Sequence, residues 1–248
     1  RSSIGKMALN GVEATASMGI DTPLAVLSHE HQPLFNYFKQ LFAQVTNPPI
    51  DCIREEIVTS TSVYVGRDGN LLEEEPKNCQ VLKINNPILT NTDMLKIKNM
   101  KVEGFKAVTV PITYYKSAPL DRAMDRLFVE VDRAHRAGAN ILILSDRGVD
   151  ENHVAIPSLL AVSAVHQHLV KTKKRTSLAI ILESGEPREV HHFATLLGYG
   201  ACAINPYLAL DTIHELIEEG MIKNDYSAAV EDYNHAVISG IVKLAAKM

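Results

Sequence analysis

Side chains suited to acid–base or anion-binding chemistry lie at or just after the ends of two apolar runs of the chain, at residues 140–145 and 177–182. Where the two strands are neighbours, such carboxylate, hydroxyl and guanidinium groups can form an anion site or an acid–base pair. The alternative is a network of Asp–Arg and Glu–Arg ion pairs that fixes the loops or docks another domain. We favour the ion pairs, because a position in a fold is only an analogy for function. The side chains concerned are Ser145, Asp146, Arg147, Glu183, Ser184 and Arg188.

The ten histidines raise the question of a metal site. His166 and His168 are two residues apart, and His191 and His192 are adjacent. Residues at these spacings point to different sides of a helix, whereas ligands four apart share a face. A metal would need two histidines to meet between neighbouring helices, so a solvated or capping role is the preferred interpretation.

The cysteines and glycines also lack the spacing of known sites. Cys52, Cys79 and Cys202 form no C-x-x-C pair, which argues against a disulfide framework, a zinc site or an iron–sulfur cluster. Neither G-x-G-x-x-G nor G-x-x-x-x-G-K-[ST] occurs, so no phosphate-binding loop is indicated. We therefore predict that this chain contains no metal site and no cofactor site.

Composition excludes further classes of function. The chain has 248 residues with 25 basic and 29 acidic side chains, a net charge of 25 − 29 = −4 and a pI near 6.2. Such a balance is a poor match for nucleic acid, whose binding rests on phosphate neutralisation. No apolar run approaches the ~20 residues that span a bilayer. We expect no nucleic-acid or membrane partner, and the unpaired cysteines indicate the cytoplasm.

The elements that would position these side chains form an α/β pattern. Four β-branched apolar runs, at 107–113, 140–145, 177–182 and 201–204, alternate with helical patterns. Pro157, Pro187 and Pro206 begin three of those helices, and Gly138, Gly198 and Gly220 follow helix ends. Strands that are apolar throughout are covered on both faces, and crossover helices make them parallel. We predict an α/β fold, either an incomplete β/α-barrel-like sheet or an open doubly wound sheet.

The remaining segments complete a single predicted domain. Residues 1–24 contain scattered glycines and no lasting periodicity, so they are interpreted as an N-terminal strap or linker. One α/β domain is expected over residues 25–248. Within it, residues 33–60 are helical, residues 105–220 hold the regular β/α units, and residues 226–247 form a C-terminal helix.

Long ungapped stretches of the chain together match the pattern of one family. They are Ser17–Ser28, Tyr37–Asp51, Ile143–Gly148, Ala155–Leu160, Glu183–Phe193, Leu197–Ala201 and Asn205–Leu208. These stretches resemble the central domain of the glutamate synthase large chain. The resemblance extends from about Ala14 to the end, and such long stretches are far more specific than a short motif. One departure is Cys52, where the family pattern has proline after Ile50-Asp51, which leaves the start of that helix open.

The resemblance implies a role between two catalytic domains. In that family a glutaminase domain releases ammonia, and a flavin domain with FMN and an iron–sulfur cluster combines it with 2-oxoglutarate to form glutamate. The central domain is then a barrel-related connector beside the ammonia path, excised here and inactive by itself, with the glutaminase and flavin domains as its partners. The reductant, ferredoxin or a nicotinamide, is recognised outside this chain.

Two further expectations follow. Gln44 and Asn47 stand among polar residues that need not pack in a core, so we expect them on a docking surface toward partner domains.

The hypothesis that competes with the connector role is a free-standing barrel-like lyase or flavoprotein, with its site at the carboxyl ends of the strands.

Overall fold

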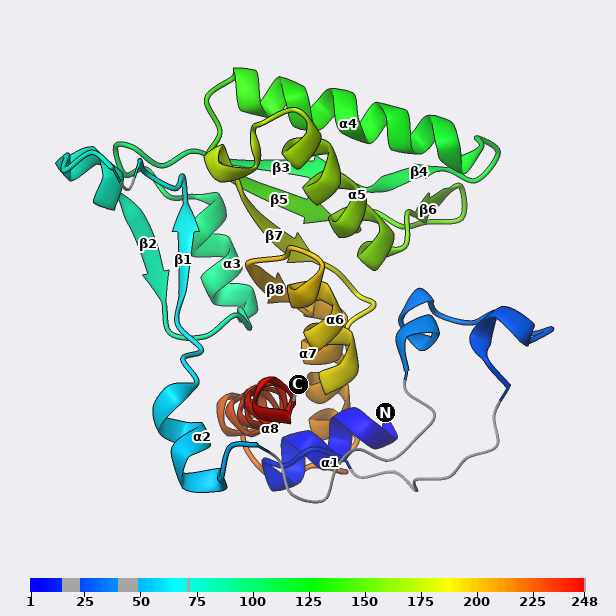
Figure 1. The fold of residues 1–248 in the computed structure, drawn as a ribbon. Helices are drawn as coiled ribbons and strands as arrows, with labels where there is room; N and C mark the ends of the chain where they lie inside the picture. The colour runs from blue at the N-terminus through cyan, green and yellow to red at the C-terminus, as the bar shows by residue number, and fades with distance from the viewer. Residues whose placement is uncertain (15–22, 40–48, 71, 248) are drawn as a thin grey trace. The chain divides into compact units, whose positions relative to one another are not determined.

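The computed structural model describes residues 1–14, 23–39, 49–70 and 72–247 (Figure 1). The chain divides into two compact units, where the sequence predicts one domain after residue 24. The sheet unit comprises Ser62–Glu186 and Leu196–Leu208. The helical unit comprises Arg1–Thr61, Pro187–Thr195 and Ala209–Met248.

Four parallel strands form the centre of the sheet unit. They are β3 (Ala107–Pro111), β5 (Ile141–Ser145), β7 (Ala179–Glu183) and β8 (Ala203–Asn205). Their order in the sheet is β3-β5-β7-β8, and each neighbouring pair is parallel. The predicted α/β fold is therefore confirmed. Because the strands follow chain order without a reversal, the arrangement is that of a β/α barrel rather than of a doubly wound sheet, and within the described residues it stays open.

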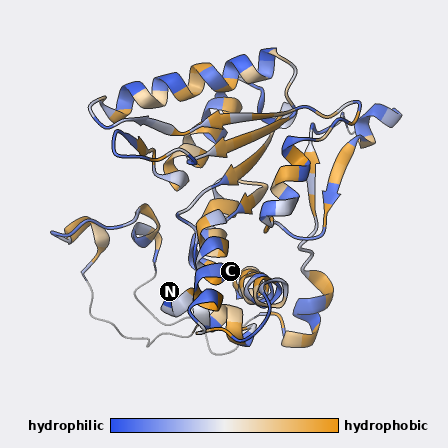
Figure 2. Cartoon of the chain, turned by 180° about the vertical axis from the view of Figure 1, so that it is seen from behind, coloured by the Kyte–Doolittle hydropathy of each residue, from blue (hydrophilic) through white to orange (hydrophobic). Residues whose placement is uncertain are grey.

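Two helices run beside the sheet where the sequence predicts crossovers (Figure 1). Helix α4 (Leu120–Arg136) contacts β3, and α5 (Ser158–Lys171) contacts β7 and α4. Helix α4 buries a stripe of apolar residues at helical spacing, which includes Leu127 and Val131, and Gly138 follows it with φ 84°. Figure 2 shows the central strands as hydrophobic and the outer helix as a mixture. A short 3-10 turn, η4 (Arg175–Ser177), connects α5 to β7.

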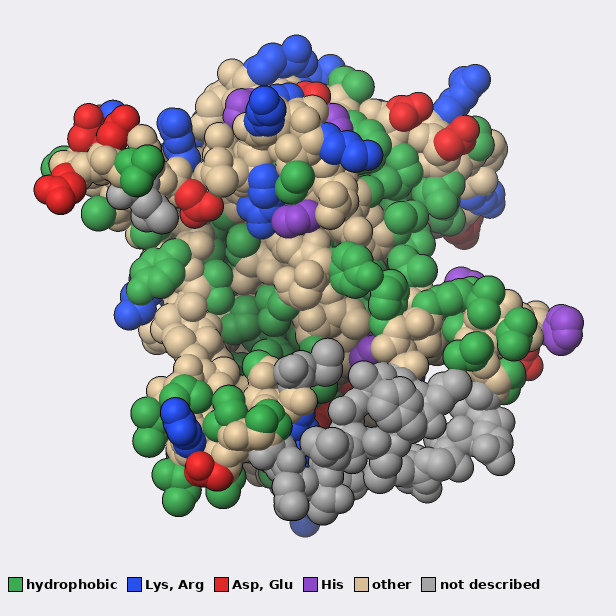
Figure 3. Space-filling model, viewed as in Figure 1, with side chains coloured by type: hydrophobic (Ala, Val, Ile, Leu, Met, Phe, Trp, Pro, Cys, Tyr) green, Lys and Arg blue, Asp and Glu red, His purple; other side chains and the backbone are tan. Residues whose placement is uncertain are grey.

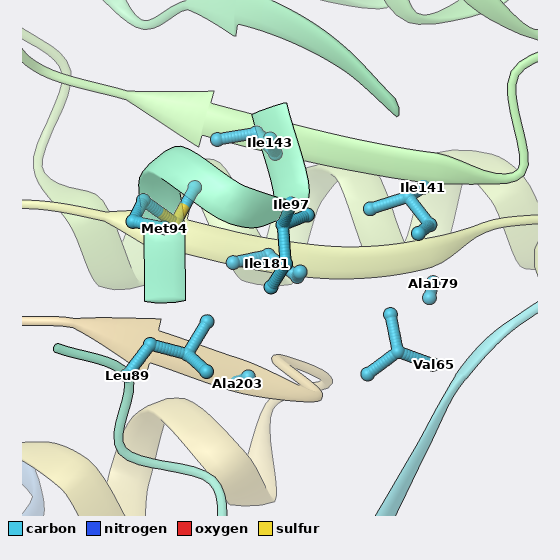
Figure 4. Packing of buried hydrophobic residues seen from close by; sticks show 9 residues of the cluster. All are labelled: Val65, Leu89, Met94, Ile97, Ile141, Ile143, Ala179, Ile181 and Ala203. Atoms are coloured by element: carbon cyan, nitrogen blue, oxygen red, sulfur yellow. The ribbon is translucent and has the colours of Figure 1, made fainter. Parts of the chain in front are cut away.

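The other face of the sheet is covered by elements that precede the predicted β/α units in the chain. A hairpin of β1 (Val63–Gly66) and β2 (Val81–Ile84), with η3 (Pro76–Cys79) in its connection, lies there with α3 (Asn91–Lys98). Inward side chains of the strands meet these elements in one apolar cluster (Figure 4). In a closed barrel this face would line the interior, so the hairpin and α3 fill the space of a barrel core. The cluster is Val65, Leu89, Met94, Ile97, Ile141, Ile143, Ala179, Ile181 and Ala203.

Two smaller features complete the sheet unit. Strands β4 (Thr113–Tyr115) and β6 (His153–Ala155) pair antiparallel beyond the ends of β3 and β5. The connection between β1 and β2 carries exposed Glu73, Glu74 and Glu75. Figure 3 shows acidic side chains gathered over this connection, as the charge run predicts for a solvated loop.

In the helical unit, the first part of the segment expected as an N-terminal strap is a helix. Residues Ser2–Asn10 form helix α1, which packs along α8 (Tyr226–Lys247) (Figure 1). Ile4, Met7 and Ala8 are buried, and their spacing of three and four residues defines one helix face. The glycines conceal this short pattern, since Gly5 lies within the helix and Gly11 ends it at φ 63°. The predicted C-terminal helix at 226–247 agrees with α8.

The predicted helical region at 33–60 is formed in part. Two 3-10 turns, η1 (Ala25–Leu27) and η2 (Leu34–Phe38), precede helix α2 (Cys52–Val58). Asp51 is the N-cap of α2, and its carboxylate accepts hydrogen bonds from the amides of Ile53 and Arg54 at 3.1 and 2.9 Å. Cys52 is therefore the first helical residue, which settles the start that the family pattern left open.

Helices α6 (Val190–Gly198) and α7 (Tyr207–Glu218) begin close to Pro187 and Pro206, as predicted. Each passes from one unit to the other along its length. Within the described part of the chain, no helix is both long and apolar enough to cross a lipid bilayer.

Candidate functional site at the carboxyl edge of the sheet

The register of the parallel strands brings the predicted polar residues together. Ser145 ends β5, Glu183 ends β7 and Asn205 ends β8, and they stand opposite one another as Cα partners. All three are buried, with exposed fractions between 0% and 4%. This row at the carboxyl edge is the place where parallel α/β proteins carry their sites.

Glu183 is the centre of an ion-pair cluster. Lys98 Nζ lies 2.8 Å from both carboxylate oxygens, Arg147 Nε donates to Oε1 at 2.9 Å, and Ser145 Oγ donates to Oε2 at 2.5 Å. Burial by itself raises the pKa of the Glu183 carboxyl, but the bonds from Lys98, Ser145 and Arg147 outweigh it, so the pKa is lowered. Glu183 is therefore ionised near neutral pH. The predicted Glu–Arg pair forms between Glu183 and Arg147.

Lys98 was not found from the sequence. It stands in the last turn of α3, and 85 positions separate it from Glu183. A lysine near a helix C-terminus is common on solvated surfaces, so no local pattern marks this one as an ion-pair partner.

Asp146 has hydroxyl and amide partners where the sequence predicts an arginine. Its carboxylate accepts from Ser184 Oγ at 2.5 Å, from Tyr207 Oη at 2.8 Å and from the Gly185 amide at 3.1 Å. Burial raises the pKa of the Asp146 carboxyl, and these three hydrogen bonds oppose it only in part. Burial and the bond to Asp146 also raise the pKa of the Tyr207 hydroxyl. Within the described residues the expected Asp–Arg pair does not form.

Arg147 instead contacts Glu183 and Tyr207. Its guanidinium carbon lies 4.0 Å from the centre of the Tyr207 ring, which is a cation–π distance. The sequence does not place Tyr207 at the carboxyl edge of the sheet, because it follows Pro206 as the first residue of α7 and has the pattern of that helix. Ser184, by contrast, is at the site as predicted, through its bond to Asp146.

One predicted residue, Arg188, makes other contacts, and two lie outside the described part of the chain. Arg188 belongs to the helical unit, where its amide donates to His192 Nδ1 at 3.2 Å and its carbonyl accepts from Tyr233 Oη at 3.0 Å. Gln44 and Asn47 lie outside the described residues.

The histidines have separate partners. His166 Nδ1 accepts from Arg175 Nε at 2.9 Å, and His168 Nε2 lies 3.1 Å from Asp132 Oδ1. In the helical unit, His191 Nε2 lies 2.8 Å from the carbonyl of Phe35. Across residues 1–14, 23–39, 49–70 and 72–247, no three His, Cys, Asp or Glu side chains are grouped as metal ligands.

A family profile described as the glutamate synthase central domain matches residues 1–248. The chain belongs to this family. It is 47% identical over 238 residues to the "Glutamate synthase [NADPH] large chain" of Bacillus subtilis, covering 96% of this chain and 16% of that one. The resemblance seen in the sequence is thereby confirmed.

Two further relatives of the glutamate synthase central domain carry other names. The chain is 42% identical to "Glutamate synthase [NADH]" of Saccharomyces cerevisiae, covering 98% of this chain and 12% of that one. It is 39% identical to "Ferredoxin-dependent glutamate synthase 2" of a Synechocystis species, covering 98% and 16%. The chain thus spans between 12% and 16% of the length of these three relatives.

Proposed function

We propose that this chain is the connector domain of a glutamate synthase. In this role it holds a glutaminase domain and a flavin domain beside the path of ammonia, and it contributes no catalytic residue, metal or cofactor of its own. FMN and the iron–sulfur cluster belong to the flavin domain. The observation that carries the proposal is that both buried carboxylates at the carboxyl edge are engaged by other groups of the chain.

A general acid or base must exchange a proton with a substrate near the working pH. Glu183 is held ionised by Lys98 and Arg147, which makes it a poor proton donor at neutral pH. Asp146 directs its oxygens at Ser184, Tyr207 and Gly185, and it is 4% exposed. These arrangements hold the loops after β5 and β7 in place, which is the work of a rigid scaffold.

The sheet supports the same proposal. Barrel enzymes that bind a phosphate group commonly do so at the loops after the seventh and eighth strands. The described part of this chain has four parallel strands, with the hairpin and α3 against the face that would line a barrel. The sheet therefore serves as a solid support in this proposal, rather than as a flavin site.

The relatives support a domain that does not select the reductant. Proteins named for NADPH, NADH and ferredoxin all match this chain, at between 39% and 47% identity. A domain that bound the reductant would be expected to differ more among the three. The reductant is accordingly recognised in another part of the enzyme.

The test uses a full-length glutamate synthase that carries this chain as its central domain. Asp146→Asn keeps the shape of the side chain and removes its ability to ionise. We expect glutamine hydrolysis and ammonia-dependent glutamate formation, measured separately, to stay within about twofold of wild type, because general acid–base groups contribute on the order of 100-fold or more. Asp132→Asn, in a part-exposed ion pair with Lys174, is the matched control.

The connector role is tested by the coupling of the two half-reactions rather than by their separate rates. The ratio of glutamate formed to glutamine hydrolysed reports coupling between the two half-reactions, and it is the readout on which this domain is expected to act. If folded Asp146→Asn enzyme loses ammonia-dependent synthesis by about 100-fold, the edge is a catalytic site. The lyase or flavoprotein hypothesis would then replace the connector proposal.

A further inference from the structure

The guanidinium group of Arg147 is held in one orientation by two contacts. Nε donates to Glu183 Oε1 at 2.9 Å, and the group lies 4.0 Å from the centre of the Tyr207 ring. The side chain is nevertheless 45% exposed. An arginine that is fixed in this way loses less rotamer freedom when it binds a further group.

The two terminal nitrogens of Arg147 have no acceptor among the described residues. Glu183 is shared with Lys98, which lies 2.8 Å from both of its oxygens. The other carboxylates nearby are also engaged: Asp146 accepts from Ser184, Tyr207 and Gly185, and Glu186 accepts from the amide and hydroxyl of Ser158. The terminal N–H groups of Arg147 therefore form a fixed fork of donors open to solvent.

A fork of parallel N–H donors matches a carboxylate, which accepts two bonds in one plane. The surroundings favour a carboxylate on a protein rather than a phosphate. Val149, two residues along the same loop, is 55% exposed, and an apolar neighbour suits a protein surface. The loop after β5 turns at Gly148, which has φ 100°.

We propose that Arg147 and the loop 147–149 form a docking surface for an aspartate or glutamate in another part of the glutamate synthase polypeptide. The inference rests on the proposed connector function. Relatives of this family are six to eight times longer than the matched segment, since the chain covers between 12% and 16% of them, so the polypeptide supplies such a surface. Arg147 is in this view a docking residue and not a catalytic one.

The experiment places a photoreactive p-benzoyl-phenylalanine at position 149 of the full-length enzyme. After illumination, mass spectrometry identifies the peptide that is captured. We expect a peptide from outside residues 1–248 that contains an aspartate or glutamate. Arg147→Gln lowers the yield by about fivefold, the upper end for a part-exposed ion pair, and added salt lowers it in the wild type.

Two variants control the result. Arg147→Lys keeps the charge without the fork, so its yield falls between those of wild type and Arg147→Gln. Arg122→Gln changes an exposed arginine on α4 and leaves the yield unchanged. Thermal unfolding of Arg147→Gln stays close to wild type, because Lys98 continues to neutralise Glu183.

Three outcomes overturn the docking proposal: capture only of peptides within residues 1–248, no captured peptide at all, or a yield that Arg147→Gln does not change. These outcomes leave the separate half-reactions of Asp146→Asn untouched, so failure of the docking surface and failure of the connector function are distinguishable.

Discussion

Replacing Glu183 with glutamine is expected to destabilise the sheet unit. Glu183→Gln keeps the size of the side chain and removes the charge that Lys98 and Arg147 share. Breaking a buried ion pair from one side costs about 3–5 kcal/mol, because the remaining charges lose their partner in a medium that solvates them poorly. Here Lys98 is 27% and Arg147 is 45% exposed, so both cations regain some water. The lower end, about 3 kcal/mol, is the expected loss.

The loss has a defined pH dependence. The pKa of Glu183 in the folded chain lies below its ordinary value of 4.5, so its contribution to stability is complete above 4.5. As the pH falls through the folded pKa, the carboxylate is protonated and the contribution disappears. The stability of wild type and Glu183→Gln should therefore converge in acid.

Urea unfolding of the 248-residue chain measures the effect. The chain contains no tryptophan, so tyrosine emission and far-ultraviolet circular dichroism are the two probes. In a thermal scan, 3 kcal/mol corresponds to a decrease in Tm of roughly 6–12 °C for a chain of this size. The control is Glu130→Gln, whose ion pair with Arg133 is exposed on α4 and is worth about 1 kcal/mol or less. If Glu183→Gln costs no more than this control, the cluster does not stabilise the fold.

Asp146→Asn should show the opposite pH dependence. Because the pKa of Asp146 is raised above 3.8, the stability of wild type relative to the variant increases as the pH falls from neutral through the raised pKa. A urea series in which this relative stability increases with rising pH would contradict the prediction. Gly200→Ala should cost about 2 kcal/mol or more, since Gly200 has φ 116° and a Cβ would lie 2.4 Å from His166 Nδ1. Gly138→Ala, at φ 84° with no atom within 4 Å of a Cβ, should cost less in the same urea assay, and equal losses would show that contact with His166 is unimportant.

The sequence predicts most of the sheet unit because its signals there are local. Residues such as Ile141–Ser145 form an uninterrupted apolar run, which indicates a strand buried on both faces. Proline at helix starts and glycine after helix ends mark the boundaries of the crossovers. The hairpin and α3 are not predicted in this way, because their apolar runs are short. Helix α3 has eight residues, and its sequence signal is limited to the capping box of Thr90 and Asp93.

The candidate site divides in the same way. The sequence by itself determined that Ser145, Asp146 and Glu183 stand at strand ends, and parallel pairing of neighbouring strands then brings them to one edge. Only the tertiary structure decided their partners. Lys98 reaches Glu183 because α3 packs across the sheet, and Tyr207 takes the place expected of an arginine at Asp146. The choice of partner depends on distances between side chains far apart along the chain, and the periodicity that identifies helices and strands contains no information on those distances.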